Sequence, residues 1–255
     1  MGEADKTKYL NIGKVLWLGF GFWLLFMAFN TVQGLNTQIF EQEGYETAAF
    51  YSLTLLYLTA TSFNLLSANM VKRLGIKWSL VCGASGYVAY MAVCMVFSLC
   101  LDQGASGNGV IGFLYFLVLL GGFCCGLGST ILWVACGAQI TKCSNEFNKS
   151  FFMGVFWSVL MLSQLLGNLV AGLVFSSLDH WKFYLIMMIS GILGSFTFLF
   201  TQTPEEQKLL GDDARQVNAE DDGEEASKPL RALLQETIDY MSERDMKSTI
   251  LMSAY

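Results

Sequence analysis

Residues 121–141 read GGFCCGLGSTILWVACGAQIT, a stretch that contains no charged residue. It holds five glycines and three cysteines together with Ser129 and Trp133. Four interpretations are open at the outset: a phosphate-binding loop, a metal site, the lining of a pore, or a helix that packs closely against its neighbours. The residues before it are also apolar, and the charge-free segment is long enough to cross the hydrocarbon core of a bilayer, which needs about 20 residues of helix.

Segments of this kind recur along the first 200 residues. The chain is 54% hydrophobic and only 14% charged, whereas a soluble domain has about 25% charged residues. Long spans in lipid are helical, because each backbone N–H and C=O group must be satisfied within its own segment. The sequence therefore predicts an all-α, multi-pass membrane protein whose residues 1–200 form a six-helix bundle. The predicted spans are residues 15–33, 48–70, 78–100, 110–135, 151–175 and 183–200.

Lysine and arginine are distributed unevenly between the two sides of these spans. Eight lie in the leader and in the second and fourth connections, whereas the first, third and fifth connections together have only Lys182. Short cytoplasmic loops carry an excess of such residues. We therefore expect both termini to be cytoplasmic.

The composition changes after residue 200. Residues 201–229 contain nine acidic and three basic residues, a balance typical of a disordered linker, here cytoplasmic. Residues 230–247 have leucine, isoleucine and methionine on one face and are predicted to form an amphipathic surface helix. Residues 248–255 become apolar again and are predicted to begin a seventh span. Six spans followed by a linker are the pattern of one half of a transporter fold with two similar halves.

The second connection carries a motif. The stretch ANMVKRLGIK, residues 68–77, resembles the cytoplasmic loop motif of the major facilitator superfamily, with Arg73, Gly75 and Lys77 at matching positions. Ala68 replaces the usual glycine and Lys72 the usual aspartate, so this sequence lacks the carboxylate of the charge relay that the motif implies.

Within that superfamily the chain resembles the Unc-93-like, ion-channel-regulator-like family. The matching segments are GFGFWLLFMAFNTVQGLNT (19–37), GLGSTILWVACGAQIT (126–141), QLLGNLVAGLVF (164–175) and, more weakly, residues 244–246. The resemblance implies the N-terminal half of that fold. It also implies a membrane protein that regulates or escorts another one, such as a potassium channel or a receptor. Two alternatives stay open: a transporter or facilitator of a small solute, and a truncated half-transporter that needs a second half or a second copy.

Neutral polar residues enter the spans in helical register. Trp157, Gln164 and Asn168 share one stripe of the fifth span, and Asn30 and Gln33 lie near the end of the first. Such side chains are expected to face protein or a water-filled cavity rather than lipid. We treat them, with Trp133, as candidate cavity-lining residues. Hydrogen bonding between helices is the alternative, at about 0.6 kcal/mol per pair.

Other chemistry finds little support in the sequence. The seven cysteines form no CxxC pair, so we expect buried apolar thiols and no metal site or cofactor. Every acidic or basic residue between Val15 and Phe200 lies in a connection, which leaves no base for a serine nucleophile and no carboxylate at membrane depth. The only histidine, His180, is expected to be an exposed interfacial residue, with pH sensing as an alternative. We predict neither an enzyme nor a nucleic-acid-binding protein.

These exclusions narrow the interpretation of the opening stretch. Gly122, Gly126, Ser129 and Trp133 fall on one helical stripe, and Gly122 to Gly126 is a GxxxG step that allows another backbone to approach closely. Gly128 belongs to a second narrow face with Gly121 and Cys125. The stretch is therefore predicted to be a packing seam, and Trp133 to be either a gate of a cavity or an interfacial anchor.

Overall fold

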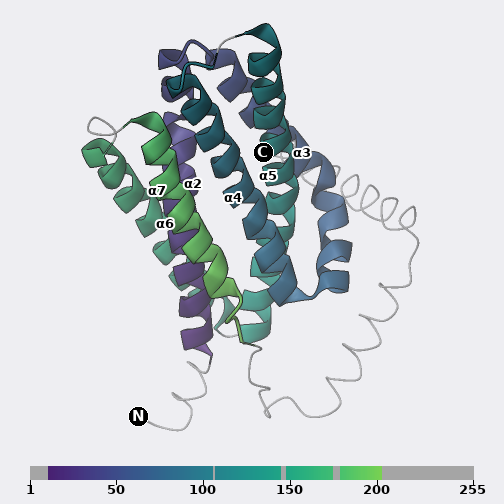
Figure 1. Cartoon of the computed structure of the whole chain (residues 1–255). Coiled ribbons are helices and arrows are strands. Elements are labelled where there is room, and N and C mark those ends of the chain that lie inside the picture. The colour runs from purple at the N-terminus through teal and green to yellow at the C-terminus, as the bar shows by residue number, and fades with distance from the viewer. Residues whose placement is uncertain (1–10, 106, 145–147, 175–178, 203–255) are drawn as a thin grey trace, which may run out of the picture. The chain divides into compact units, whose positions relative to one another are not determined.

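The computed structural model describes residues 11–105, 107–144, 148–174 and 179–202, and every regular element in these residues is an α-helix (Figure 1). All six helices of the described residues are long and apolar enough to cross a membrane. This confirms the all-α, multi-pass fold class. The helices are α2 (Ile12–Gln42), α3 (Glu46–Leu74), α4 (Ile76–Asp102), α5 (Asn108–Cys143), α6 (Lys149–Val174) and α7 (His180–Phe198).

The helices differ in extent from the predicted spans. The first four helices extend beyond the predicted 15–33, 48–70, 78–100 and 110–135 at both ends. The reason is that the prediction counted only charge-free residues, whereas a helix continues through the polar interface until its terminal groups are satisfied. Three predicted segments lie outside the described residues: the amphipathic helix at 230–247, the start of a seventh span at 248–255, and the linker beyond residue 202.

The helices pack as two groups of three. Helix α2 packs against α6 and α7, and α5 packs against α3 and α4, while contacts between α4 and α7 join the groups (Figure 1). The five most extensive of the helix–helix interfaces map onto one another when the first three helices are exchanged for the last three. Such internal equivalence is what the paired three-helix repeats of a transporter half produce.

The central seam lies on α5 and is built by glycine. A Cβ atom on Gly122 would lie 2.5 Å from the Ser52 carbonyl oxygen, and one on Gly126 2.5 Å from that of Leu56, so this face touches the α3 backbone directly. On the other side, a Cβ atom on Gly128 would lie 2.5 Å from the Gly83 carbonyl oxygen of α4. Helix α5 therefore contacts a neighbouring backbone on both of its narrow faces.

Charge separates the two ends of the bundle. We call one the acidic end, where α2 and α4 end and α7 begins; its side chains include Glu41, Glu43, Glu46, Asp102 and Asp179. We call the opposite one the basic end; its side chains include Lys14, Lys72, Arg73, Lys77, Lys142 and Lys149.

Candidate functional site

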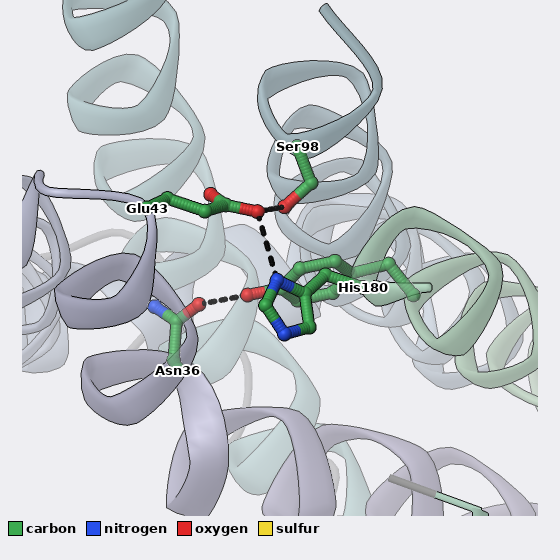
Figure 2. A network of polar contacts seen from close by, with 5 residues as sticks. Asn36, Glu43, Ser98 and His180 are labelled. Carbon is green, nitrogen blue, oxygen red and sulfur yellow. Dashed lines mark hydrogen bonds and ion pairs between the residues drawn. The ribbon is translucent and has the colours of Figure 1, made fainter. Parts of the chain in front are cut away.

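Three side chains meet at the acidic end: Glu43, just after α2, Ser98 of α4 and His180 of α7. His180 Nδ1 lies 3.2 Å from Glu43 Oε1, and the Ser98 hydroxyl donates a hydrogen bond of 2.5 Å to the same oxygen (Figure 2). The Glu43 side chain is only 12% exposed and that of His180 27%. The expectation that His180 is an exposed residue was therefore wrong, because it is half-buried and packs over the Glu43 carboxylate.

Local backbone geometry brings Glu43 to this position. Its N–H group continues the helical pattern of α2 by donating to the Ile39 carbonyl oxygen at 3.1 Å. Gly44 then adopts a φ of 84°, a conformation that favours glycine, and the Tyr45 N–H group returns to the Phe40 carbonyl oxygen at 2.6 Å. This tight reversal folds Glu43 back over the end of the bundle. The sequence shows only that Glu43 lies in a connection.

A cavity of about 560 Å³ opens beside this cluster. Three carboxylates, an imidazole and two aromatic rings are among the groups that line it: Glu43, Asp102, Asp179, His180, Tyr45 and Trp181. Asp179 is paired with Lys182 at 2.5 Å, on the half-exposed rim. The cavity is therefore polar and acidic, with its most buried carboxylate held by His180 and Ser98.

A second polar layer lies about one to two helical turns deeper. The Tyr184 hydroxyl donates to Asn36 Oδ1 at 2.6 Å, and Asn36 Nδ2 donates to the Tyr90 hydroxyl at 2.9 Å. Ser52 Oγ lies 3.1 Å from that Tyr90 hydroxyl. Asn36, Tyr90 and Tyr184 are all fully buried, so this network joins α2, α3, α4 and α7 inside the bundle.

The predicted polar residues of the first span lie beside this network. Gln33 is half-buried and donates a hydrogen bond to the Tyr57 hydroxyl of α3. Asn30, one turn earlier, is half-buried as well. Asn36 was not singled out from the sequence, although it follows Gln33 by three positions. This helical spacing is the one feature of the sequence that points to Asn36.

The remaining predicted cavity residues lie on α5 and α6. Trp133 is half-buried and stacks on Trp157, with ring centroids 5.7 Å apart and planes 17° apart. Trp133 also contacts Phe26 of α2 at 5.2 Å. Gln164 and Asn168 are exposed on α6, and neither amide has a hydrogen-bond partner within the described part of the chain. Trp157, Gln164 and Asn168 form what we call the α6 polar face.

The loop motif lies at the basic end. Arg73 occupies the last turn of α3, Lys77 the first turn of α4, and both are exposed. Gly75 joins the two helices with a φ of 75°, which explains the glycine at this position. Lys77 and Lys142 line a smaller cavity of about 370 Å³.

The described residues contain no group of three or more histidine, cysteine, aspartate or glutamate side chains arranged to hold a metal ion. The cysteines there are free, and four of them are buried. The acidic-end cluster offers one imidazole, one hydroxyl and one carboxylate, which join the ends of three helices by hydrogen bonds.

The chain belongs to the Major Facilitator Superfamily, because the model of that family matches residues 18–237. This agrees with the six apolar helices and with the paired three-helix arrangement, and it makes the chain an integral, multi-pass membrane protein.

Within the superfamily, the curated relatives are UNC93-like proteins. UNC93-like protein MFSD11 of Xenopus tropicalis is 26% identical over 235 residues, which cover 87% of this chain and 47% of the relative. Protein unc-93 homolog A of Bos taurus is 31% identical over 178 residues, which cover 66% of this chain and 35% of the relative. These matches confirm the Unc-93-like resemblance. The chain spans about half the length of the relatives it matches, or less, and no solved structure matches it.

Proposed function

We propose that this protein is a non-enzymatic, Unc-93-like membrane protein that regulates or escorts another integral membrane protein, which it binds through the α6 polar face. One observation supports this proposal above the others: Gln164 and Asn168 project from a membrane span without a hydrogen-bond partner in the described residues. Moving an amide into hydrocarbon without a partner costs about 4–8 kcal/mol. A partner span that carries hydrogen-bonding side chains would remove that cost.

The neighbouring side chains suit a protein partner. Trp157 is 43% exposed and lies about two turns from Gln164 and about three from Asn168 on the same face. Met161, between Trp157 and Gln164, is 47% exposed. An aromatic ring and a flexible thioether beside polar groups are features that protein interfaces favour. The family resemblance implies that the protein bound is a channel or a receptor. A second half or a second copy of the fold would offer the same kind of surface.

Replacing both amides tests the proposal. If each forms one interhelical hydrogen bond of about 0.6 kcal/mol, the Gln164→Leu, Asn168→Leu double variant should recover the partner roughly sevenfold less well, since 1.4 kcal/mol is a factor of ten. The measurement is quantitative co-purification of the tagged full chain in mild detergent, combined with a photo-crosslinking residue at position 164. We expect a discrete protein adduct from position 164.

The control is Gln103→Leu, an exposed amide outside α4, which should leave recovery of the partner unchanged. Solute transport is the alternative function, since the same face could line half of a cavity. Uptake of a solute by proteoliposomes that is lost in the Gln164→Leu variant, without any adduct, would replace the proposed function with transport.

The orientation in the membrane is also a proposal. The chain enters α2 and leaves α7 at the basic end, and basic loops favour the cytoplasm. We expect a protease on the cytoplasmic side to cleave within residues 205–228 and to leave residues 101–109 intact, as read by mass spectrometry of sealed vesicles. Cleavage at 101–109 with protection of 205–228 would invert the orientation.

A further inference from the structure

The smaller cavity at the basic end lies where four helix ends come together. Its walls are formed by the end of α3, the start of α4, the end of α5 and the chain just after α7. Its volume of about 370 Å³ is within the range of pockets that hold small molecules. Because three spans end or begin at this cavity, it lies close to the membrane surface.

One side of the cavity is cationic. Lys77 in the first turn of α4 and Lys142 in the last turn of α5 both line it, and both are exposed. Neither lysine forms an ion pair with a described residue, and no carboxylate is among the described residues of the wall. An ammonium group has three hydrogen-bond donors and no acceptor. The two lysines therefore favour an anion between α4 and α5.

Neutral donors of the wall suit the same kind of anion. Gly75 precedes α4 and gives it no side-chain cap, so the N–H groups of the first turn have no acceptor within the helix. The Thr201 hydroxyl oxygen is buried and has no hydrogen-bond partner in the described residues. Gln139, only 2% exposed, donates to the Gln202 carbonyl oxygen at 3.0 Å and so holds the chain after α7 against α5. Phosphate oxygens accept hydrogen bonds from such groups.

The other side of the cavity is apolar. Trp78 is 57% exposed and Leu74 is 41% exposed, and both line the cavity together with Ile76. Tryptophan is typical of the membrane interface, where its ring lies at the level of the lipid headgroups. A water-soluble anion would contact only the lysines, whereas a lipid with an anionic headgroup would contact both sides.

We propose that this cavity binds the phosphate headgroup of an anionic phospholipid. Lys77 and Lys142 hold the phosphate, and Leu74 and Trp78 contact the first part of the acyl chains. Basic pockets between spans are suited to such headgroups. The cavity is lined by helix ends other than those of α6, so this inference does not depend on the partner proposed for the α6 polar face.

Native mass spectrometry of the full chain tests the proposal, with dioleoylphosphatidylglycerol and dioleoylphosphatidylcholine added in equal amounts to the detergent micelles. We expect one phosphatidylglycerol to be retained in preference to phosphatidylcholine. Lys77→Gln and Lys142→Gln should each weaken this binding about fivefold, the loss expected for one lysine beside an anionic headgroup, and the double variant about 25-fold. The control is Lys149→Gln, an exposed lysine of the same end that is not among the described residues of the wall. It should leave the binding unchanged.

A second measurement reports on the apolar side. Phosphatidylglycerol with brominated acyl chains quenches tryptophan fluorescence on contact, and the difference between the wild type and Trp78→Phe isolates the signal of Trp78. We expect quenching of Trp78 to saturate together with lipid binding. It should be lost in the double lysine variant and kept in Lys149→Gln.

Three results would overturn the proposal. An equal loss of binding in Lys149→Gln would mean that the lipid is attracted to the basic end as a whole. Equal retention of phosphatidylcholine would mean that the lysines do not select an anionic headgroup. Displacement of the lipid by millimolar inorganic phosphate, with binding of that phosphate lost in the double lysine variant, would assign the cavity to a soluble anion.

Discussion

Replacing Gly126 by leucine is expected to abolish stable assembly of the bundle. A Cβ atom at this position would lie 2.5 Å from the Leu56 carbonyl oxygen and 2.8 Å from Thr59 Cβ, both on α3. The obstacle is backbone, which cannot rotate away, so α3 and α5 would have to separate along their whole seam. Overpacking costs 1–3 kcal/mol and occasionally more. With the close contact at Gly122 also lost, we expect more than about 3 kcal/mol.

Fluorescence-detected size exclusion and thermal unfolding measure this effect. The control is Gly112→Leu, also on α5 but exposed, where a Cβ atom would meet nothing within 4 Å; it should leave the Tm nearly unchanged or raise it, because glycine is a poor helix former. Gly126→Ala should lie between the two. If Gly126→Leu gave a monodisperse protein with the wild-type Tm, the seam between α3 and α5 would not be what holds the bundle together.

The glycine stripe illustrates what a single helix reveals about packing. Helical spacing shows that Gly122 and Gly126 share a face and that Gly128 lies on another. The same spacing cannot tell which helix covers each face, because that depends on how all six helices rotate and cross. In the structure the first face meets α3 and the second meets Gly83 of α4.

The polar residues show a different limit of the sequence. Runs without charge predicted the six helices, and the uneven distribution of lysine and arginine predicted which connections are basic. The acidic-end cluster was missed because Glu43 belongs to a connection by sequence, whereas the turn at Gly44 folds its side chain back to Ser98 and His180. Asn36 was missed because its partners, Tyr90 and Tyr184, lie 54 and 148 residues away in the chain. Contacts of this kind follow from tertiary packing, and no local pattern in the sequence identifies the two partners.

The second large effect is expected at Asn36. Its side chain is fully buried and holds two tyrosine hydroxyls, one through its oxygen and one through its amide nitrogen. In Asn36→Leu the Tyr184 hydroxyl loses its acceptor, whereas Tyr90 keeps Ser52 at 3.1 Å. A buried polar group left unsatisfied costs about 1–3 kcal/mol. We expect a loss of stability in this range, measured by thermal or denaturant unfolding in detergent.

A double-mutant cycle distinguishes the network from mere packing. Tyr184→Phe removes the hydroxyl that Asn36→Leu leaves unpaired. Tyr184→Phe should therefore lower the free energy of unfolding much less in the Asn36→Leu background than in the wild type, with a coupling energy of about 0.5–3 kcal/mol. Asn64→Leu, at an exposed asparagine of α3, should change stability by no more than about 0.5 kcal/mol. Strict additivity of Asn36→Leu and Tyr184→Phe would mean that the 2.6 Å contact between the two side chains contributes nothing to the stability of the bundle.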